Sequence, residues 1–305
     1  MPTEVMQMLT GKLLGDGNLS IEKGKRPRFR FSHSSADSGW CFHCYETLKA
    51  HIPLSKPKYR RMSDNRIEAG YTEQFYVQSK LSPLFDSLLP LWYKERTKSI
   101  PFHFLEQVIN PLTLAWWYQD DGHLKIQNNT PKKIILSTDS FHQKENRFLI
   151  ELLYTQFKLH FKLDGQNRLV IYDQKQILLF LRIVHPYLHD SMKRKMLSPS
   201  ESEITFPDSK RTSIHIPIRI QIKKPTQEIR DVIDKSLNLD PLSLYESYFS
   251  LSITKEMKIR KSYQIVLTRK HQEFLDLIKR ETGMNISEAV GTMLNLNAHV
   301  NRKRL

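Results

Sequence analysis

Residues 9–17 read LTGKLLGDG, and residues 114–122 read LAWWYQDDG. Each segment is apolar along most of its length and ends in Asp-Gly. This pattern predicts a helix that delivers a carboxylate at its C-terminal end, before the glycine lets the chain turn away. A single Asp-Gly pair usually indicates an ordinary turn. Two pairs that close apolar helices in one chain favour a functional role for both.

The two segments belong to a faint internal duplication, in which the copies are 105 residues apart, the separation of Asp16 from Asp121. Leu9 matches Leu114 at the same separation. In each copy the motif helix precedes an alternating strand, a helical stretch, further strands and a last apolar helix. The pattern predicts an α/β (α+β) fold with two pseudo-symmetric αββαββα-like halves.

Two such helices, packed against each other, would place the carboxylates of Asp16 and Asp121 side by side. Paired carboxylates at carbonyl-rich helix ends are a good place for divalent cations, because Mg²⁺ prefers hard oxygen ligands. Two metal ions roughly 4 Å apart activate water and stabilise the leaving oxygen in phosphodiester hydrolysis. We therefore expect a site for two or more Mg²⁺ ions; the role of the neighbouring Asp120 stays open.

The composition favours a polyanionic partner. The chain has 47 Lys plus Arg against 32 Asp plus Glu, a formal net charge of +15, although a basic protein without such a partner is the alternative. No run of about 18 apolar residues predicts a membrane span, and no signal peptide is evident. Cys41 and Cys44 are the only cysteines and are expected to be buried thiols rather than half a zinc site.

Basic residues alternate with aromatic residues in the stretch KRPRFRF. Because successive strand side chains point to opposite faces, we expect Arg26, Arg28 and Arg30 to share one face and Phe29 and Phe31 the other. The apolar face would pack on helices and the basic face would meet phosphates or guanine edges, with a solvated charged face as the alternative. The other residues of this unit expected to contact DNA are Lys58, Arg60 and Lys125.

The two acidic segments resemble the paired motifs of single-chain LAGLIDADG homing endonucleases, and residues 96–122 are especially similar to intron-encoded members. The likeness covers roughly residues 5–205. It implies a twisted β-saddle that lies in the major groove, and a double-strand cut that leaves short 3′ overhangs. The family's motif has small residues where this chain has Trp116 and Asp120, so we expect the two motif helices to pack more loosely or with a different rotation.

The resemblance also implies roles for individual residues. The last acidic residue of each motif binds the catalytic metal ions in this family, which points to Asp16 and Asp121. The family also places a basic residue near each scissile phosphate, and Lys98 and Lys195 are similar to these residues. The residues that compete with Lys195 for this role are Lys193 and Arg194.

The C-terminal part contains a second duplication, with copies 45 residues apart. It follows a stretch rich in Ser, Pro and charge at residues 198–213, which predicts a linker. Each copy predicts a short strand, a helix, a turn and another helix, and the apolar residues at 218–222 match those at 263–267. Asp240 and Asn285 are helix-capping types at matched positions.

Residues 268–294 resemble the ribbon-helix-helix DNA-binding family, and GMNISEAV at 283–290 is the most specific part. The resemblance implies that two strands pair as an antiparallel ribbon, which enters the major groove. The expected alternation points Arg219, Gln221 and Gln264 at the bases, since Arg and Gln suit bidentate contacts. A degenerate module used for dimerisation is the alternative.

These features predict a monomer of three parts, at residues 1–100, 101–205 and 206–305. The predicted function is Mg²⁺-dependent cleavage of double-stranded DNA at a long recognition site, in the cytoplasm or an organellar matrix, with no secretion and no membrane partner. One alternative is an RNA maturase that helps its host intron splice. Another is a regulator that binds DNA without cutting it. The intact acidic pair favours the nuclease.

Overall fold

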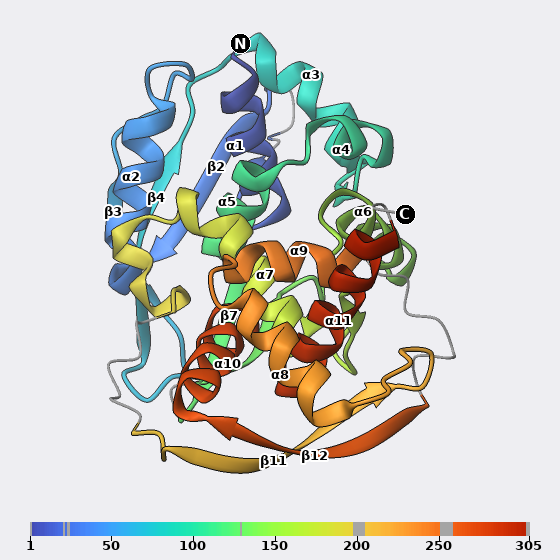
Figure 1. Cartoon of the computed structure of the whole chain (residues 1–305). Coiled ribbons are helices and arrows are strands. Elements are labelled where there is room, and N and C mark those ends of the chain that lie inside the picture. Colours follow the sequence, from blue (N-terminus) through green and yellow to red (C-terminus); the bar gives the residue numbers. More distant parts are fainter. Residues whose placement is uncertain are drawn as a thin grey trace. The chain divides into compact units, whose positions relative to one another are not determined.

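The computed structural model describes residues 2–20, 22, 25–128, 130–197, 205–250 and 259–302. The chain divides into two compact units, residues 1–199 and 200–305 (Figure 1). Each unit has its own apolar core. The first unit contains both acidic segments, and the second contains the C-terminal repeat. Among the described residues, no helix combines the length and the apolar character needed to cross a membrane.

The first half of the N-terminal unit forms an antiparallel sheet with the strand order β1-β2-β4-β3. Helix α1 precedes this sheet, α2 connects β2 to β3, and α3 follows β4. Phe29 and Phe31 of β2 are fully buried in the apolar core, so this face of the strand packs as its alternation predicts. The elements are α1 (Thr3–Leu14), β1 (Asn18–Ser20), β2 (Arg28–Ser34), η1 (Ser35–Asp37), α2 (Ser38–Leu48), β3 (Lys58–Ser63), β4 (Tyr71–Gln78) and α3 (Pro83–Trp92).

The second half repeats this arrangement, with the strand order β7-β8-β10-β9. Strand for strand it matches the first sheet, and a helix again precedes, connects and follows the strands. The expected α/β fold of two αββαββα halves is therefore confirmed. The elements are β5 (Tyr93–Lys94), β6 (Thr97–Lys98), α4 (Phe102–Val108), α5 (Pro111–Asp121), β7 (Gly122–Gln127), β8 (Thr130–Leu136), α6 (Gln143–Phe157), β9 (Lys162–Leu163), β10 (Leu169–Ile171), α7 (Gln174–Val184), η2 (His185–Tyr187) and η3 (Asp190–Lys195).

The two motif helices, α1 and α5, pack directly against each other. Leu9 of α1 and Trp117 of α5 are fully buried in the shared core. Asn110 caps the N-terminus of α5: its side chain accepts a hydrogen bond from the N–H of Thr113 at 2.8 Å. Pro111 takes the next position, where a helix needs no N–H donor.

Of the two arrangements expected for these helices, a looser contact or a different rotation, the looser contact is wrong. Gly11 of α1 lies against Trp116, and a methyl group on Gly11 would lie only 2.6 Å from the Cβ of Trp116. Gly15 lies against Asp120 in the same way, with a corresponding separation of 2.6 Å from its Cβ. At these two matched positions the first motif has the glycine, which makes room for the larger residue of the second motif.

The two cysteines of α2 have the role that the sequence predicts. Cys41 and Cys44 are both free thiols with no solvent exposure. The Sγ of Cys41 donates to the carbonyl oxygen of Phe75 at 3.6 Å, across to β4. These residues are therefore part of the core.

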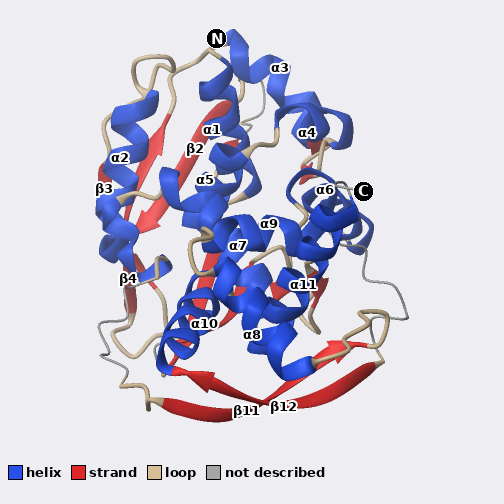
Figure 2. Cartoon of the chain, in the orientation of Figure 1, coloured by secondary structure: helices blue, strands red, loops and turns tan. Residues whose placement is uncertain are grey.

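The C-terminal unit is built from two consecutive strand–helix–helix segments, whose strands β11 and β12 pair antiparallel along their whole length. Figure 2 shows this ribbon running along one side of the helices of the same unit. Ile214 and Ile216 of β11 are buried with Ile265 and Leu267 of β12, beneath the helices. The elements are β11 (Ser209–Pro217), α8 (Pro225–Ser236), α9 (Pro241–Ser250), β12 (Arg260–Thr268), α10 (Arg269–Thr282) and α11 (Ile286–Arg302).

Two segments of this unit were predicted at the wrong positions in the sequence. The predicted linker at 198–213 includes residues 209–213, which belong to β11; residues 198–204 lie outside the described part of the chain. The predicted strand at 218–222 is instead the connection that follows β11, and Ile218 is 57% exposed. The helices do keep the 45-residue separation, since Ile229 and Phe274 are both buried. The first copy thus has an extra connection between its strand and its helix, which the second copy lacks.

Candidate active site

The two motif helices end side by side, and each end presents an aspartate. Helix α1 ends at Leu14, so Asp16 follows in the turn, with 35% of its side chain exposed. Helix α5 ends at Asp121 itself, which is half-buried. Burial, together with the negative charges of Asp16 and Asp120, raises the pKa of Asp121 to about 8. The two predicted carboxylates therefore lie close enough to repel each other.

Asp16 has compensating partners. Its Oδ2 lies 3.1 Å from the Nδ1 of His33, which comes from β2. Burial acts to raise the pKa of Asp16, but the hydrogen bond with His33 and the charge of Lys12 outweigh burial and hold that pKa below its usual value. Asp16 is thus stabilised as a carboxylate.

Asp120, which directly precedes Asp121 in α5, is the centre of a buried polar network. Its Oδ1 accepts hydrogen bonds from the Nζ of Lys12 and from the Nε1 of Trp40, each at 2.8 Å. Its Oδ2 accepts a hydrogen bond from the backbone N–H of Asp16 at 3.1 Å. The side chains of Lys12 and Asp120 are both fully buried. Asp120 therefore ties α5 to the turn that carries Asp16.

Lys12 is an ammonium buried inside the contact between the helices. Burial acts to lower its pKa, but the charge of Asp120 outweighs burial, so the pKa of Lys12 is raised. Its Nζ also lies 2.8 Å from the Nε2 of His33 and 4.4 Å from the centre of the Phe31 ring. Sequence reasoning missed Lys12, His33 and Trp40, because their shared partners are distant in the chain.

Lys98 and Lys195, the two basic residues implied by the family resemblance, each bind the carbonyl end of a motif helix. The Nζ of Lys98 donates to the carbonyl oxygens of Gly17 at 2.9 Å and Gly15 at 3.4 Å. The Nζ of Lys195 donates to the carbonyl oxygens of Tyr118, Gln119 and Asp120 at 3.0, 2.6 and 3.1 Å. Burial lowers the pKa of each lysine to about 8.

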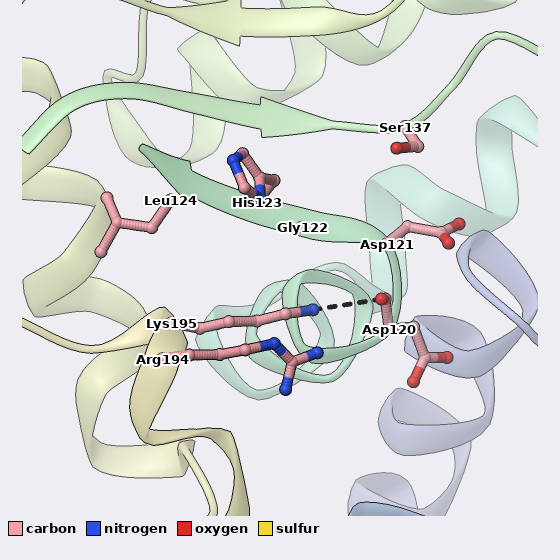
Figure 3. A pocket seen from close by; sticks show the side chains of 8 residues that line it. All are labelled: Asp120, Asp121, Gly122, His123, Leu124, Ser137, Arg194 and Lys195. Carbon is pink, nitrogen blue, oxygen red and sulfur yellow. Dashed lines mark hydrogen bonds between the residues drawn. The ribbon is translucent and has the colours of Figure 1, made fainter. Parts of the chain in front are cut away.

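The competing residues beside Lys195 do not bind the end of the motif helix. Arg194 makes a paired contact with Asp37, with N–O distances of 2.5 and 2.9 Å, and Lys193 is exposed. Figure 3 shows Lys195 reaching the backbone of Asp120, while the side chains of Asp120 and Asp121 point away from it. Of the three candidates, Lys195 is the one held at the end of the motif helix. The residues that line the pocket here are Asp120, Asp121, Gly122, His123, Leu124, Ser137, Arg194 and Lys195.

These groups suit a divalent cation. Ligand atoms of Asp16, His33 and Asp120 lie within 4.8 Å of one another. The oxygens of Asp120 already accept three hydrogen bonds, and both ring nitrogens of His33 have partners. Asp121, the partner that the sequence predicts for Asp16, is not part of this group. A divalent cation held by the two carboxylates would offset the burial and the repulsion that raise the pKa of Asp121.

The sheet of the first half has a polar, basic open face. Arg28 and Arg30 are half-exposed on β2, opposite the buried Phe29 and Phe31. Strand β3 lies at the sheet edge, and its Lys58 and Arg60 pair in register with Tyr76 and Gln74 of β4. In an antiparallel sheet, paired residues share a face, so these side chains lie on the same face as Arg30 and Ser32, which pair with Gln78 and Tyr76.

Two further predicted DNA contacts lie at the margins of these sheets. Arg26 precedes β2, so it does not share the strand face as expected, and its Nε lies 3.5 Å from the Oδ2 of Asp86. Lys125 is exposed on β7 and pairs in register with Lys133 of β8. The second half thus also presents basic residues.

The predicted readers on the C-terminal ribbon are partly wrong. Arg219 and Gln221 lie in the connection after β11, because the strand ends at Pro217. Gln264 is exposed on the outer face of β12, as expected, and donates to the Oγ of Ser213 at 2.7 Å. The other exposed residues with outward positions on this ribbon are Ser209, Arg211, Ser213, His215, Arg260, Ser262 and Thr268.

Comparisons with known proteins bear on residues 1–199. The family model described as the LAGLIDADG DNA endonuclease family matches residues 6–178. An uncharacterised protein of Methanocaldococcus jannaschii is 29% identical over 208 residues, which cover 63% of this chain and 73% of that protein. The DNA endonuclease I-ChuI of Chlamydomonas applanata is 26% identical over 208 residues, covering 62% of this chain and 92% of that enzyme.

A splicing protein is also similar. The cytochrome b mRNA maturase bI2 of Saccharomyces cerevisiae is 25% identical over 210 residues, which cover 63% of this chain but only 47% of the maturase. Among solved structures, the homing endonuclease I-WcaI bound to its DNA recognition sequence superposes with a TM-score of 0.57 at 23% identity, covering 64% of this chain and 87% of that one. This likeness supports the fold described above.

Proposed function

Since the chain belongs to the LAGLIDADG DNA endonuclease family, we propose that it is a site-specific endonuclease that cuts both strands of duplex DNA by metal-dependent hydrolysis. The observation that carries the proposal is the packing of α1 against α5, which brings the turn with Asp16 to the end of the helix that carries Asp121. The cut leaves short 3′ overhangs, and Mg²⁺ is the metal ion.

Each residue of the site has a distinct role in this proposal. A divalent cation bound here supplies activation of water and stabilisation of the leaving oxygen. Asp16 and Asp121 hold it through their carboxylates. Lys98 and Lys195 bind backbone carbonyl oxygens at the ends of the two motif helices. Their positive charges would stabilise the negative charge that develops at the scissile phosphates.

Recognition of the target uses the open faces of the two sheets. Arg28, Arg30, Lys58 and Arg60 of the first half, with Lys125 of the second, contact the phosphates and base edges of a long duplex site. Each phosphate that is neutralised makes binding more sensitive to salt, by about −0.9 in the slope of log K against log salt. The chain works as a monomer, because it carries both motifs itself.

The C-terminal unit adds affinity as a ribbon-helix-helix-like DNA-binding module. Its antiparallel ribbon presents Arg211, His215 and Gln264 outward, and these side chains suit base edges. Asn285 caps α11, since its Oδ1 accepts a hydrogen bond from the N–H of Glu288 at 3.0 Å, so this helix start is ordered near the ribbon. Truncation after residue 199 should leave a nuclease that binds its full site more weakly.

An RNA maturase is the second candidate, because a curated relative is named a maturase. The two activities differ in the nucleic acid that binds. A maturase prefers the folded intron RNA, whereas the nuclease prefers the duplex without the intron. A regulator that binds DNA without cutting would leave the acidic pair without a role.

The test uses purified full-length protein with host DNA that contains or lacks the intron, and with the intron RNA. We expect cleavage of the intronless DNA in Mg²⁺ and none in the presence of a chelator. Tight binding of the intron RNA, with rescue of splicing and no cleavage of either DNA, would instead establish the maturase. Binding without cleavage or splicing would establish the regulator.

A further inference from the structure

His33 lies between the buried Lys12 and the exposed Asp16. It belongs to β2, where the alternation places it on the buried face, and its side chain is only 4% exposed. Its Nε2 lies 2.8 Å from the Nζ of Lys12. Its Nδ1 lies 3.1 Å from the Oδ2 of Asp16. Nδ1 therefore faces a carboxylate, whereas the charged group nearest to Nε2 is the ammonium of Lys12. The Oδ1 of Asp120 lies farther from Nε2, at 3.7 Å.

These neighbours determine which nitrogen carries the proton. An ammonium has three donors and no acceptor, so the Nε2 of His33 must accept the hydrogen bond from Lys12. Lys12 is held as an ammonium by the Oδ1 of Asp120 at 2.8 Å. A neutral imidazole has one N–H, which is then on Nδ1 and donates to Asp16.

The second half has no counterpart of this arrangement. At the 105-residue separation, the position of His33 is taken by Thr138. The hydroxyl of Thr138 donates to the carbonyl oxygen of Asn167 at 3.1 Å, not to the carboxylate of Asp121. Among the described residues, no side chain donates a hydrogen bond to the carboxylate of Asp121.

We propose that His33 is the positioning residue of the first motif: Lys12 fixes its Nδ1–H tautomer, and the Nδ1–H orients the carboxylate of Asp16 for the metal ion. The hydrogen bond occupies Oδ2 of Asp16 and leaves Oδ1 to face the ion. The two motif ends are then unequal, with Asp16 oriented in advance and Asp121 oriented only by the ion itself. The consequence for cleavage rests on the proposed nuclease function, whereas the tautomer does not.

Groups that orient a metal ligand typically contribute 10- to 100-fold in metal affinity or activity. The variants His33→Asn and His33→Gln distinguish the roles of the two ring nitrogens. The amide of Asn stands in for Nδ1 and retains a donor for Asp16. The amide of Gln stands in for Nε2, which retains a partner for Lys12 but withdraws the donor from Asp16.

The first measurement is the tautomer of His33 in the metal-free full chain, from ¹⁵N–¹H long-range correlation of labelled histidine. The signal is assigned by its absence in His33→Gln. We expect Nδ1 to be protonated and Nε2 to be unprotonated. A proton on Nε2, or on both nitrogens, overturns the proposal, and this result is independent of whether the protein cuts DNA.

The second measurement is Mn²⁺ binding to the same proteins, followed by the EPR signal of the free ion. Relative to wild type, His33→Gln should bind Mn²⁺ about 10- to 100-fold more weakly, and His33→Asn should lose much less. Thr138→Val is the matched control in the second half and should bind as wild type. In cleavage, the half-saturating Mg²⁺ concentration should rise in the same order.

Equal Mn²⁺ binding by wild type, His33→Asn and His33→Gln would overturn the proposal, provided that thermal melting shows all three folded. If either variant does not fold, the tautomer in the wild-type chain still decides. Failure of the wild type to cut any DNA, with the expected tautomer and Mn²⁺ binding intact, would refute the nuclease function and leave the positioning role of His33 standing.

Discussion

The two motif ends share a scaffold but differ in what surrounds their carboxylates. In both halves the sheet has the same strand order, and in both a lysine binds the carbonyl end of the motif helix. Asp16 has His33 and Lys12 nearby, which hold its pKa low, whereas burial and the charges of Asp16 and Asp120 raise the pKa of Asp121 to about 8. The two halves thus share the position of the aspartate at the motif end, but they differ in the charged groups that surround it.

The largest expected effect comes from removing either carboxylate. Asp16→Asn and Asp121→Asn should each abolish double-strand cleavage in Mg²⁺, because each aspartate is expected to bind the metal rather than the bases. Target binding should stay within about tenfold of wild type, which is about 1.4 kcal/mol. A labelled duplex target reports both quantities. Full cleavage by either variant would show that the two ends do not share the chemistry.

The next effect concerns the buried ion pair between Lys12 of the first motif and Asp120 of the second. Trp117 stands in the second motif where the first has Lys12. Lys12→Met should lower the free energy of unfolding by about 3–5 kcal/mol, because it leaves Asp120 buried without a countercharge. Urea denaturation measures this loss.

The double variant Lys12→Met/Asp120→Asn is the matched control for that result, since it removes the orphaned charge. It should be more stable than Lys12→Met alone. If the double variant is no more stable than the single one, the unpaired charge of Asp120 does not account for the loss.

A smaller effect should come from the packing of the two motif helices. Gly11→Ala places a methyl group against Trp116 and should lower the free energy of unfolding by about 1–3 kcal/mol. Gly165→Ala is the control, because a methyl group there meets no atom within 4 Å. Equal stability of the two variants would mean that the motif helices are less closely packed than described.

The smallest effect extends the comparison to the second duplication. Arg211→Ala should weaken binding of the full target by about fivefold, because this side chain lies on the outer face of the ribbon. Arg219→Ala should weaken binding less, since Arg219 lies in the connection beyond β11. Gel-shift titration measures both. A larger loss for Arg219→Ala would place the DNA on the connection instead of the ribbon.

The sequence could predict the features that repeat. Two apolar segments that end in Asp-Gly located both motif helices, and a separation of 105 residues predicted two similar halves. Lys98 and Lys195 could be named from the family resemblance, and both lie at motif helix ends. Local periodicity and a repeated motif carry this information because they depend on neighbours in the chain.

The interactions that the sequence could not predict join distant residues. Lys12 is a lone charge in an apolar segment, and its partner Asp120 follows 108 positions later, so only the packed helices show the ion pair. The close contact at Gly11 depends in the same way on the opposite helix. At 218–222, alternating isoleucines predicted a strand, but the polar stretch at 209–213 pairs with β12 instead. Pairing with a partner strand, not alternation alone, determines which segment joins a sheet.

Strand-resolved cleavage by the wild-type chain tests the central claim most directly. The target duplex carries a different label on each strand, and the products are followed in Mg²⁺ and in the presence of a chelator. We predict that both strands are cut at staggered phosphates, leaving short 3′ overhangs, and that the chelator prevents both cuts. Undiminished cutting in the chelator, or tight duplex binding with neither strand cut in Mg²⁺, would contradict the assignment of Asp16 and Asp121 as a metal-dependent catalytic pair.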